Sequence, residues 1–301
     1  MTKRKLFLLT SCAIFFAIYL VQIIFSLQSS VKIKKLNSKD ASSIDKIEIN
    51  ANGNNFFIVR ENEKWFLGNE KYLADENKIA TLLDTITKVT LLDTISNRLG
   101  ESEKAQYEIT NSFKVVAKSN EKIVRTIFVG KNASTISQNY ISLDDEKKVY
   151  LASGDLRSQF EKTIDDLRSM KIFSLKANDI VSLSTKTKLE TLQVQKENDV
   201  WKLTNAKTEI DSEKIANWIS SIANLSASTW LSKDFVLPQE RVASVEIKTQ
   251  AETISLDLYK NENTYFAKSN ASEYPFELNE YDAKRFLKNE SDFQKAELKK
   301  E

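Results

Sequence analysis

The sequence predicts an α+β protein in which an N-terminal transmembrane helix is followed by two tandem duplicated units of antiparallel sheet with packed helices. Three patterns indicate this organisation: a long uncharged apolar run, an internal repeat without gaps, and strand-like alternation beside amphipathic helical stripes in each copy. The predicted parts are residues 1–30 as cytoplasmic tail and anchor, 31–173 as the first repeat unit and 174–301 as the second.

The apolar run extends from Leu6 to Leu27 and contains no charged residue. A helix needs about 20 predominantly apolar residues to cross the hydrocarbon core, so the run predicts an uncleaved membrane anchor. A cleaved secretory signal is an alternative because Lys3, Arg4 and Lys5 precede the run, although the apolar run of such signals is only about 7–15 residues. Lipidation at Cys12 is a second alternative, but most of the apolar run follows that residue.

The topology predicted from this anchor is a single pass through the bacterial cytoplasmic (inner) membrane, with the soluble part extracytoplasmic. The tail before the helix is short and basic and is easily retained in the cytoplasm, whereas long downstream domains cross largely regardless of charge. Four lysines that follow the anchor make the local charge count nearly equal on both sides: Lys32, Lys34, Lys35 and Lys39.

The repeat aligns Ile44 with Ile180 and continues at the same offset, without a gap, to Ile86 and Ile222. Two tryptophans and two aspartates recur together in this alignment, which indicates a duplication. The matched residues include Glu61-Asn62 with Glu197-Asn198, Trp65 with Trp201, Leu67 with Leu203, Asn69 with Asn205, Asp75 with Asp211, and Lys78-Ile79-Ala80 with Lys214-Ile215-Ala216.

Each copy opens with alternating apolar residues that predict strands joined by turns of Asn, Gly, Asp and Glu. Trp65 and Trp201 follow such turns, and we expect both to anchor a core against a helix rather than to form a stacking platform for a sugar or a base. The predicted strands are Ile47–Ile49 and Phe57–Val59 around Asn52–Asn54, and Leu189–Val194 and Val200–Leu203 around Glu197–Asp199.

One amphipathic helix follows in each copy. Asp75 and Asp211 are placed to accept backbone N–H groups of the first turn as N-caps, which explains their position better than a role as catalytic acids. Apolar residues then recur every three or four positions, so this face is predicted to be core. They are Ile79, Leu82, Leu83, Ile86 and Val89 in the first copy, and Ile215, Trp218, Ile219, Ile222 and Leu225 in the second.

The rest of each copy is predicted to be strands and a closing helix, which gives the order β-β-α-β-β-β-β-α. Asp144–Lys147 is expected to be a solvated hairpin turn rather than a cation site. Closing helices are expected around Leu156–Leu167 and Tyr281–Leu287, and the charged tail from Ser291 is expected to fray. The strands are Phe113–Ala117, Ile123–Val129, Tyr140–Leu143, Lys148–Leu151, Val245–Lys248 and Ile254–Tyr259.

Several short motifs follow one another in a recognisable order: Lys64-Trp65-Phe66-Leu67, Tyr72-Leu73-Ala74-Asp75, Tyr107-Glu108-Ile109, Gly130-Lys131, Tyr140–Leu143, Val149-Tyr150-Leu151, and a junction from Leu167-Arg168-Ser169 to Leu183. In this order, which covers nearly all of the chain, the sequence resembles the bacterial domain-of-unknown-function 4340 family. The second copy departs from the pattern, with Thr208 where Tyr72 stands and Leu237-Pro238 near the matching strand.

The resemblance implies an accessory protein of an ABC-type transport system. Members of that family are typically single-pass proteins encoded beside ABC-type permeases and a gliding-motility-like auxiliary subunit. The resemblance carries over no catalytic residue.

The residue composition argues against an enzyme. The chain has no histidine, and Cys12 is its only cysteine, which removes the commonest general base and the usual zinc ligands. A phosphate-binding loop and a nucleophile elbow are both missing from the sequence. We therefore predict no catalytic, cofactor-binding or metal-binding residues and no cofactor. Paired carboxylates such as Asp165-Asp166 remain as a route to glycoside hydrolysis, although this pair lies on the solvated face of a predicted helix.

Charge excludes a further class of partner. Without Lys3, Arg4 and Lys5, 41 basic residues face 42 acidic ones, so no nucleic-acid partner is expected. The predicted function is that of a non-catalytic, membrane-anchored extracytoplasmic accessory or scaffold protein, associated with an ABC-type transport system and with its permease and auxiliary subunits. The alternative is an envelope carboxylate-dependent hydrolase, similar to a glycosidase, that acts on cell-wall polymer.

Overall fold

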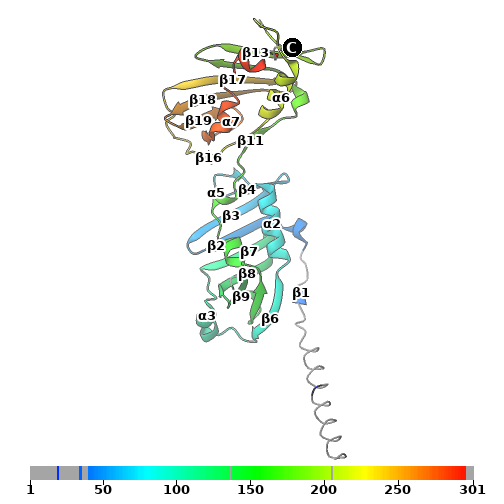
Figure 1. The fold of residues 1–301 in the computed structure, drawn as a ribbon. Coiled ribbons are helices and arrows are strands. Elements are labelled where there is room, and N and C mark those ends of the chain that lie inside the picture. Colours follow the sequence, from blue (N-terminus) through cyan, green and yellow to red (C-terminus); the bar gives the residue numbers. More distant parts are fainter. Residues whose placement is uncertain (1–18, 20–33, 36–39, 136, 205, 296–301) are drawn as a thin grey trace, which may run out of the picture. The chain divides into compact units, whose positions relative to one another are not determined.

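The computed structural model describes residues 34–35, 40–135, 137–204 and 206–295, together with Tyr19 (Figure 1). The predicted anchor Leu6–Leu27 therefore lies outside the described residues, apart from Tyr19. Within the described part of the chain, no helix has the length and the apolar character that crossing a membrane requires.

The described chain is mostly β structure with a few helices, as predicted for an α+β protein, and it divides into two compact units, Met1–Ser169 and Met170–Glu301. Each unit contains one large antiparallel sheet, with ten strands in the first unit and eight in the second. The predicted boundary after residue 173 falls inside strand β11 (Lys171–Ser174), which pairs with β15 (Asn224–Ser226) of the second unit.

The sheet of the first unit has the order β1-β6-β10-β9-β8-β7-β2-β3-β4-β5. Its strands are β1 (Lys34–Lys35), β2 (Lys46–Ala51), β3 (Asn54–Glu61), β4 (Lys64–Leu67), β5 (Tyr72–Leu73), β6 (Thr90–Ser96), β7 (Phe113–Ser119), β8 (Lys122–Asn132), β9 (Gln138–Leu143) and β10 (Val149–Ser153). Its helices are α2 (Glu76–Thr87), α3 (Glu101–Tyr107), α4 (Leu156–Phe160) and α5 (Ile164–Leu167), with the 3-10 turn η1 (Ala41–Ser43).

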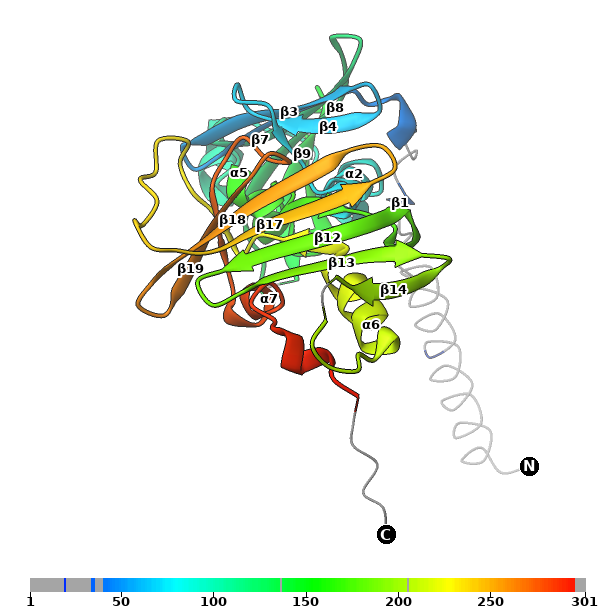
Figure 2. The same cartoon turned by 90° about the horizontal axis from the view of Figure 1, so that it is seen from above.

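The large sheet of the second unit has the order β14-β13-β12-β17-β18-β19-β20-β16, and Figure 2 shows β18, β17, β12, β13 and β14 side by side. Its strands are β12 (Ile180–Thr187), β13 (Thr191–Glu197), β14 (Val200–Leu203), β16 (Thr229–Trp230), β17 (Arg241–Thr249), β18 (Thr253–Asn261), β19 (Thr264–Ser269) and β20 (Phe276–Leu278). Its helices are α6 (Ser212–Ile222) and α7 (Glu280–Lys284), with the 3-10 turns η2 (Ala177–Asp179) and η3 (Glu290–Phe293).

The two large sheets share one strand order. The order β4-β3-β2-β7-β8-β9-β10-β6 in the first unit corresponds to β14-β13-β12-β17-β18-β19-β20-β16 in the second. The offset that relates Ile44 to Ile180 also separates η1 from η2, β4 from β14, and the first residue of α2 from that of α6. Ala74 and Ile210, which are related by the same offset, each form an isolated bridge to a later residue, Arg168 and Gln294 respectively. The aligned segments therefore have the same secondary structure, except that no strand at residues 208–209 corresponds to β5.

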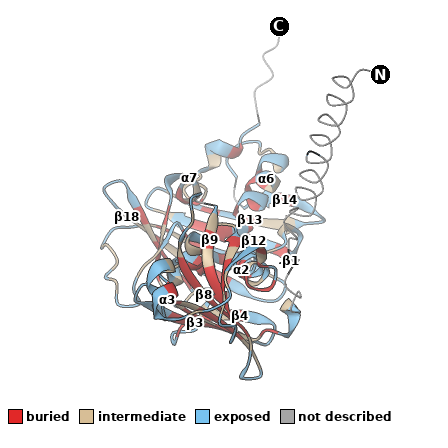
Figure 3. Ribbon diagram, turned by 90° about the horizontal axis from the view of Figure 1, so that it is seen from below, coloured by how far each residue is buried: buried red, intermediate tan, exposed pale blue. Residues whose placement is uncertain are grey.

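The core of each unit lies on one face of its sheet, against the helices. Buried residues alternate with more exposed ones along the strands (Figure 3), as at Ile47, Ile49 and Ala51 of β2. The predicted helical stripes are buried as well, which confirms that they face a core. These residues are Ile79, Leu82 and Ile86 of α2, and Ile215, Trp218, Ile219 and Ile222 of α6.

Two local expectations are wrong. The closing helix predicted around Leu156–Leu167 is two short helices: α4 ends at Phe160, and Thr163 forms a capping box with Asp166 that starts α5. The tail does not fray from Ser291: Phe293 is buried, and its carbonyl accepts the N–H of Asp211 at 2.8 Å.

Candidate functional site

The residues that the sequence analysis singled out have structural roles. Trp65 and Trp201 are 8% and 7% exposed and belong to the cores of their units, as predicted. Asp75 accepts backbone N–H groups of the second and third residues of α2 at 3.0 and 3.1 Å. Asp211 accepts the equivalent groups of α6 at 2.9 and 3.3 Å. Both N-cap predictions are confirmed, and the two carboxylates are engaged by their own helices.

The acidic turn between β9 and β10 also makes internal contacts. Asp144 accepts the backbone N–H of Thr126 at 2.8 Å, and the carboxylate of Glu146 accepts the hydroxyl of Tyr150. Burial and this hydrogen bond raise the pKa of Tyr150 above its ordinary value, so the phenol stays protonated. Among the residues that the structure describes, no group of three or more His, Cys, Asp or Glu side chains is arranged to hold a metal ion.

Three charged residues of the described chain are buried, Glu103, Arg125 and Arg168, and the sequence analysis predicted none of them to be so. Arg125 of β8 is 1% exposed, and its Nε lies 3.7 Å from Oδ2 of Asp144. Neither Nε nor Nη1 has a hydrogen-bond partner, and unsatisfied buried donors are costly. The alternation of β8 offered a signal, because Arg125 shares its sheet face with the buried Ile127 and Val129.

The surface of the first unit has open cavities of about 460, 370 and 390 Å³, and a single carboxylate is among the residues that line each of them. Glu101 in the first pairs with Lys104 at 2.9 Å. Asp166 in the second accepts N–H and O–H groups of Thr163 at 2.8 Å. Glycoside hydrolysis uses two carboxylates that flank the scissile bond, and these described cavities each supply one that is engaged by a neighbour.

The third cavity lies on the sheet face that points away from the core. Cross-strand pairing across β5, β4, β3, β2, β7 and β8 aligns six side chains there, which we call the first outer row. None of them belongs to the buried core of the unit. Leu73 and Ile123, at the two ends of the row, are 42% and 65% exposed. In strand order the row is Leu73, Phe66, Val59, Lys46, Lys118 and Ile123.

A β-bulge brings Ile123 into this row. Ala117 pairs with Arg125, but the next residue, Lys118, pairs with Ile123. Because two residues of β8 advance for one of β7, the side chain of Ile123 changes from the core face to the outer face.

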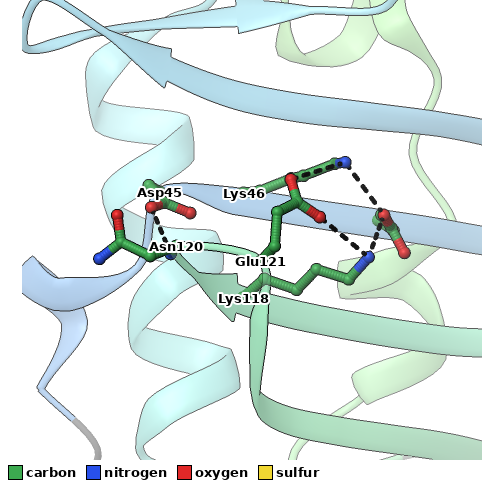
Figure 4. A network of polar contacts seen from close by, with 6 residues as sticks. Asp45, Lys46, Lys118, Asn120 and Glu121 are labelled. Carbon is green, nitrogen blue, oxygen red and sulfur yellow. Dashed lines mark hydrogen bonds and ion pairs between the residues drawn. The ribbon is translucent and has the colours of Figure 1, made fainter.

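Four charged side chains form a network at the middle of the row (Figure 4). Lys118 lies 2.7 Å from Glu48 and 3.9 Å from Glu121, and Lys46 lies 3.4 Å from each of the same two carboxylates. Partial burial alone raises the pKa of Glu48, but the hydrogen bonds and charges of Lys118 and Lys46 outweigh it and lower that pKa. The hydrogen bond to Glu48 raises the pKa of Lys118. The network therefore contains two positive and two negative groups.

The equivalent row of the second sheet is polar throughout. It runs Lys202, Gln195, Ser182, Lys248 and Thr253 across β14, β13, β12, β17 and β18. Because the two sheets have the same strand order, this fold does not require apolar residues at these positions. The apolar members of the first outer row form a surface that the second sheet lacks, and exposed apolar patches typically mark interaction sites.

Elsewhere on the same faces, the chain covers its own aromatic residues. The ring of Tyr140 on β9 packs against Tyr107 of α3, with centroids 4.7 Å apart. At the equivalent position of β19, Phe266 stacks on Phe235 at 5.4 Å. In each unit, the segment before β7 or β17 therefore covers an aromatic side chain of the outer face. It does not cover Leu73 and Ile123, the exposed ends of the first outer row.

The repeat alignment contained a signal for this surface. At the constant offset of the repeat, apolar residues of the first copy align with polar residues of the second, although the strand pattern is otherwise retained. These pairs are Phe57 with Gln193, Val59 with Gln195, Phe66 with Lys202 and Leu73 with Glu209.

Comparison with known proteins identifies a family. The model of the domain of unknown function DUF4340 matches residues 65–239, which is more than half of the chain. The match begins at β4 of the first unit and ends in the segment before β17 of the second. No curated protein and no solved structure gives a significant match. The chain therefore belongs to the DUF4340 family.

Proposed function

We propose that this chain is a non-catalytic, single-pass accessory protein of the bacterial cytoplasmic membrane, built from two copies of one unit that lie on the extracytoplasmic side. In this proposal the protein binds membrane partners, namely the permease and auxiliary subunits of an ABC-type transport system. The first outer row carries the proposal. Four of its six side chains are apolar, Val59 and Phe66 partly exposed and Leu73 and Ile123 exposed, on a face that the second unit keeps polar, and such a surface is typical of protein binding.

The predicted anchor supports the membrane part of the proposal. The run from Leu6 to Leu27 is long enough to span the hydrocarbon core. Only a short segment separates Leu27 from β1, which begins at Lys34. An extended chain covers at most ~3.3–3.6 Å per residue, so the start of the first unit is tethered within about 25 Å of the bilayer.

The experiment that tests this function is affinity purification of the full-length protein from native membranes after mild crosslinking. We expect ABC permease subunits among the captured neighbours. A form in which Leu6–Leu27 is replaced by a cleavable secretory signal is the matched control. It should recover fewer subunits, because a shared membrane raises the effective concentration of weakly binding partners.

Two results would contradict the proposal. One is turnover of cell-wall polymer or a phosphoester by the purified protein that a single carboxylate substitution abolishes. The other is recovery of the same neighbours at the same yield with and without the anchor. Topology is tested separately: protease added after the outer barrier is permeabilised should digest the units while a cytoplasmic control protein stays intact.

A further inference from the structure

We propose that the outer face of the first sheet binds the same face of a second copy of this chain, so that the protein is a face-to-face homodimer in the membrane. This inference rests on the proposed function in one respect, the anchor that holds both copies in one bilayer. It assigns the first outer row to contact between two copies, so that the permease and auxiliary subunits bind other surfaces of the dimer, and it predicts the register of the contact.

The charges on this face favour a second copy over an unrelated partner. The network of Lys46, Lys118, Glu48 and Glu121 is neutral in total. A strongly basic or acidic face would call for an oppositely charged partner, whereas a face with equal numbers of both signs is complementary to itself. Twofold dimers use such self-complementary surfaces: if residue i of one copy contacts residue j of the other, then j of the first also contacts i of the second.

The register follows from a neighbouring row. Next to the first outer row, pairing across β3, β2, β7 and β8 aligns Phe57, Glu48, Val116 and Thr126, which we call the second outer row. Val116 and Thr126 are only 7% and 8% exposed, so Phe57 and Glu48 are the members that this row presents to a partner. Consider a twofold axis that lies in the plane of the interface, midway between the two rows and at right angles to the strands. This axis places the first outer row of each copy against the second outer row of its partner. Each strand then faces itself, as in aligned sheet packing.

This axis produces favourable pairs on β2 and β3, whereas on β7 it brings Lys118 against Val116. On β2, Lys46 of one copy faces Glu48 of the other. On β3, Val59 faces Phe57, so apolar residues meet apolar residues. The same operation on the second sheet would juxtapose only polar side chains, such as Ser182 with Ser184 and Gln195 with Gln193, and gives no reason for that face to dimerise.

The outer face is too small for a stable dimer in solution, so the contact between the two copies depends on the membrane. Six strands at ~4.8 Å spacing give a row of about 25 Å, and two or three outward side chains along each strand add ~7–14 Å in the other direction. The resulting face is smaller than the ~800 Å² that each partner buries in a standard interface. Both copies are tethered to one bilayer, which raises their effective concentration and compensates for a small interface.

The test is site-specific photo-crosslinking of the full-length protein in native membranes, with a benzophenone amino acid in place of Phe66. We expect a crosslinked product at twice the chain mass of 34.4 kDa that contains this chain alone. The matched control carries the same photo-crosslinker at Lys202, the equivalent position of β14, and should give no such product.

A second measurement links the product to the register. With the crosslinker at Phe57, the double variant Val59→Gln and Phe66→Lys should reduce the yield of the homodimer by about tenfold or more, because each loss of a buried apolar side chain weakens binding by a factor of that order. The second sheet carries Gln and Lys at these positions, so the variant should keep the thermal melting curve of the wild type.

The outcomes separate this inference from the proposed function. A crosslink from Phe66 to a permease subunit and not to a second copy overturns the homodimer and supports the proposed function. Homodimer yields that are equal at Phe66 and Lys202, or unchanged by the double variant, overturn the assigned face. A specific homodimer together with turnover of an envelope substrate would support the inference and contradict the proposed function.

Discussion

Replacing Trp65 by alanine tests how the first unit is held together. The indole lies on β4, is 8% exposed, and shares a core with Ile79 and Leu82 of α2. Truncation of a buried aromatic side chain to Ala costs ~3–5 kcal/mol, because the transfer energy is lost and a cavity remains. At about 4 °C per kcal/mol for a unit of this size, the midpoint of thermal unfolding of the first unit should fall by about 12–20 °C.

The measurement must resolve the two units, because a chain with two cores need not unfold in one step. Pulsed hydrogen exchange along a temperature series does this when peptides from β3 and α2 are compared with peptides from β13 and α6. Trp65→Ala should lower the midpoint in the first set, and Trp201→Ala, with 7% exposure in the other core, should lower it in the second. Lys64→Ala, at an exposed neighbour on the same strand, is the control and should change stability by no more than ~0.5 kcal/mol. A fall of less than about 4 °C for Trp65→Ala would refute the core assignment and favour an exposed binding role for the indole.

Three further predictions concern single side chains. Asp75→Ala and Asp211→Ala each remove an N-cap and should each lower the free energy of unfolding in urea by about 0.5–2 kcal/mol, whereas Asn should preserve most of it; unchanged stability of the Ala variants would disprove the caps. Arg125→Met should leave the free energy of unfolding unchanged or raise it by ~1–3 kcal/mol, because it removes two buried nitrogens that lack partners, while Asp144 is 38% exposed and keeps its hydrogen bond to Thr126; a clear loss in the urea titration would contradict this. The folded pKa of Glu48 lies below its ordinary value of 4.5, so its contribution to stability is complete above that pH and is lost as pH falls through the folded pKa. The stability difference between wild type and Glu48→Gln should therefore shrink on acidification, and a difference that does not depend on pH would refute the contribution of the ion pairs.

Local patterns predicted the elements whose causes are local. Asp75 and Asp211 were recognisable as caps because each precedes an apolar stripe of helical period, and both stripes are buried. Strand alternation likewise predicted the core face of β2. Helix α3 and strand β6 were not predicted. The conformation of β6 depends on pairing with β10, a strand much later in the chain, and such pairing leaves little trace in a short window of sequence.

The surface proposed for binding could not be predicted from the sequence, and the reason is also a pairing between strands. Membership of the first outer row depends on register, and one bulge decides on which face Ile123 lies. A strict alternation from Ile123 to Val129 would have assigned Ile123 to the core, because a single extra residue reverses the face of every residue before it. For Arg125 the alternation of β8 indicates the correct face, which is the core. The burial of a charged side chain is energetically costly, so the sequence alone provided no reason to place Arg125 there.

The two units together provide an internal comparison that a single domain lacks. Apolar side chains on an outer face lower solubility and favour association, and the polar row of the second sheet shows that the same strand order forms without them. If Phe66 and Val59 stabilised the fold through the sheet itself, the positions of Lys202 and Gln195 would benefit equally from apolar side chains. The proposed function attributes the difference to what each face contacts. In the proposed function the first unit follows the predicted anchor in sequence, and its apolar row is then covered by a protein partner rather than by water.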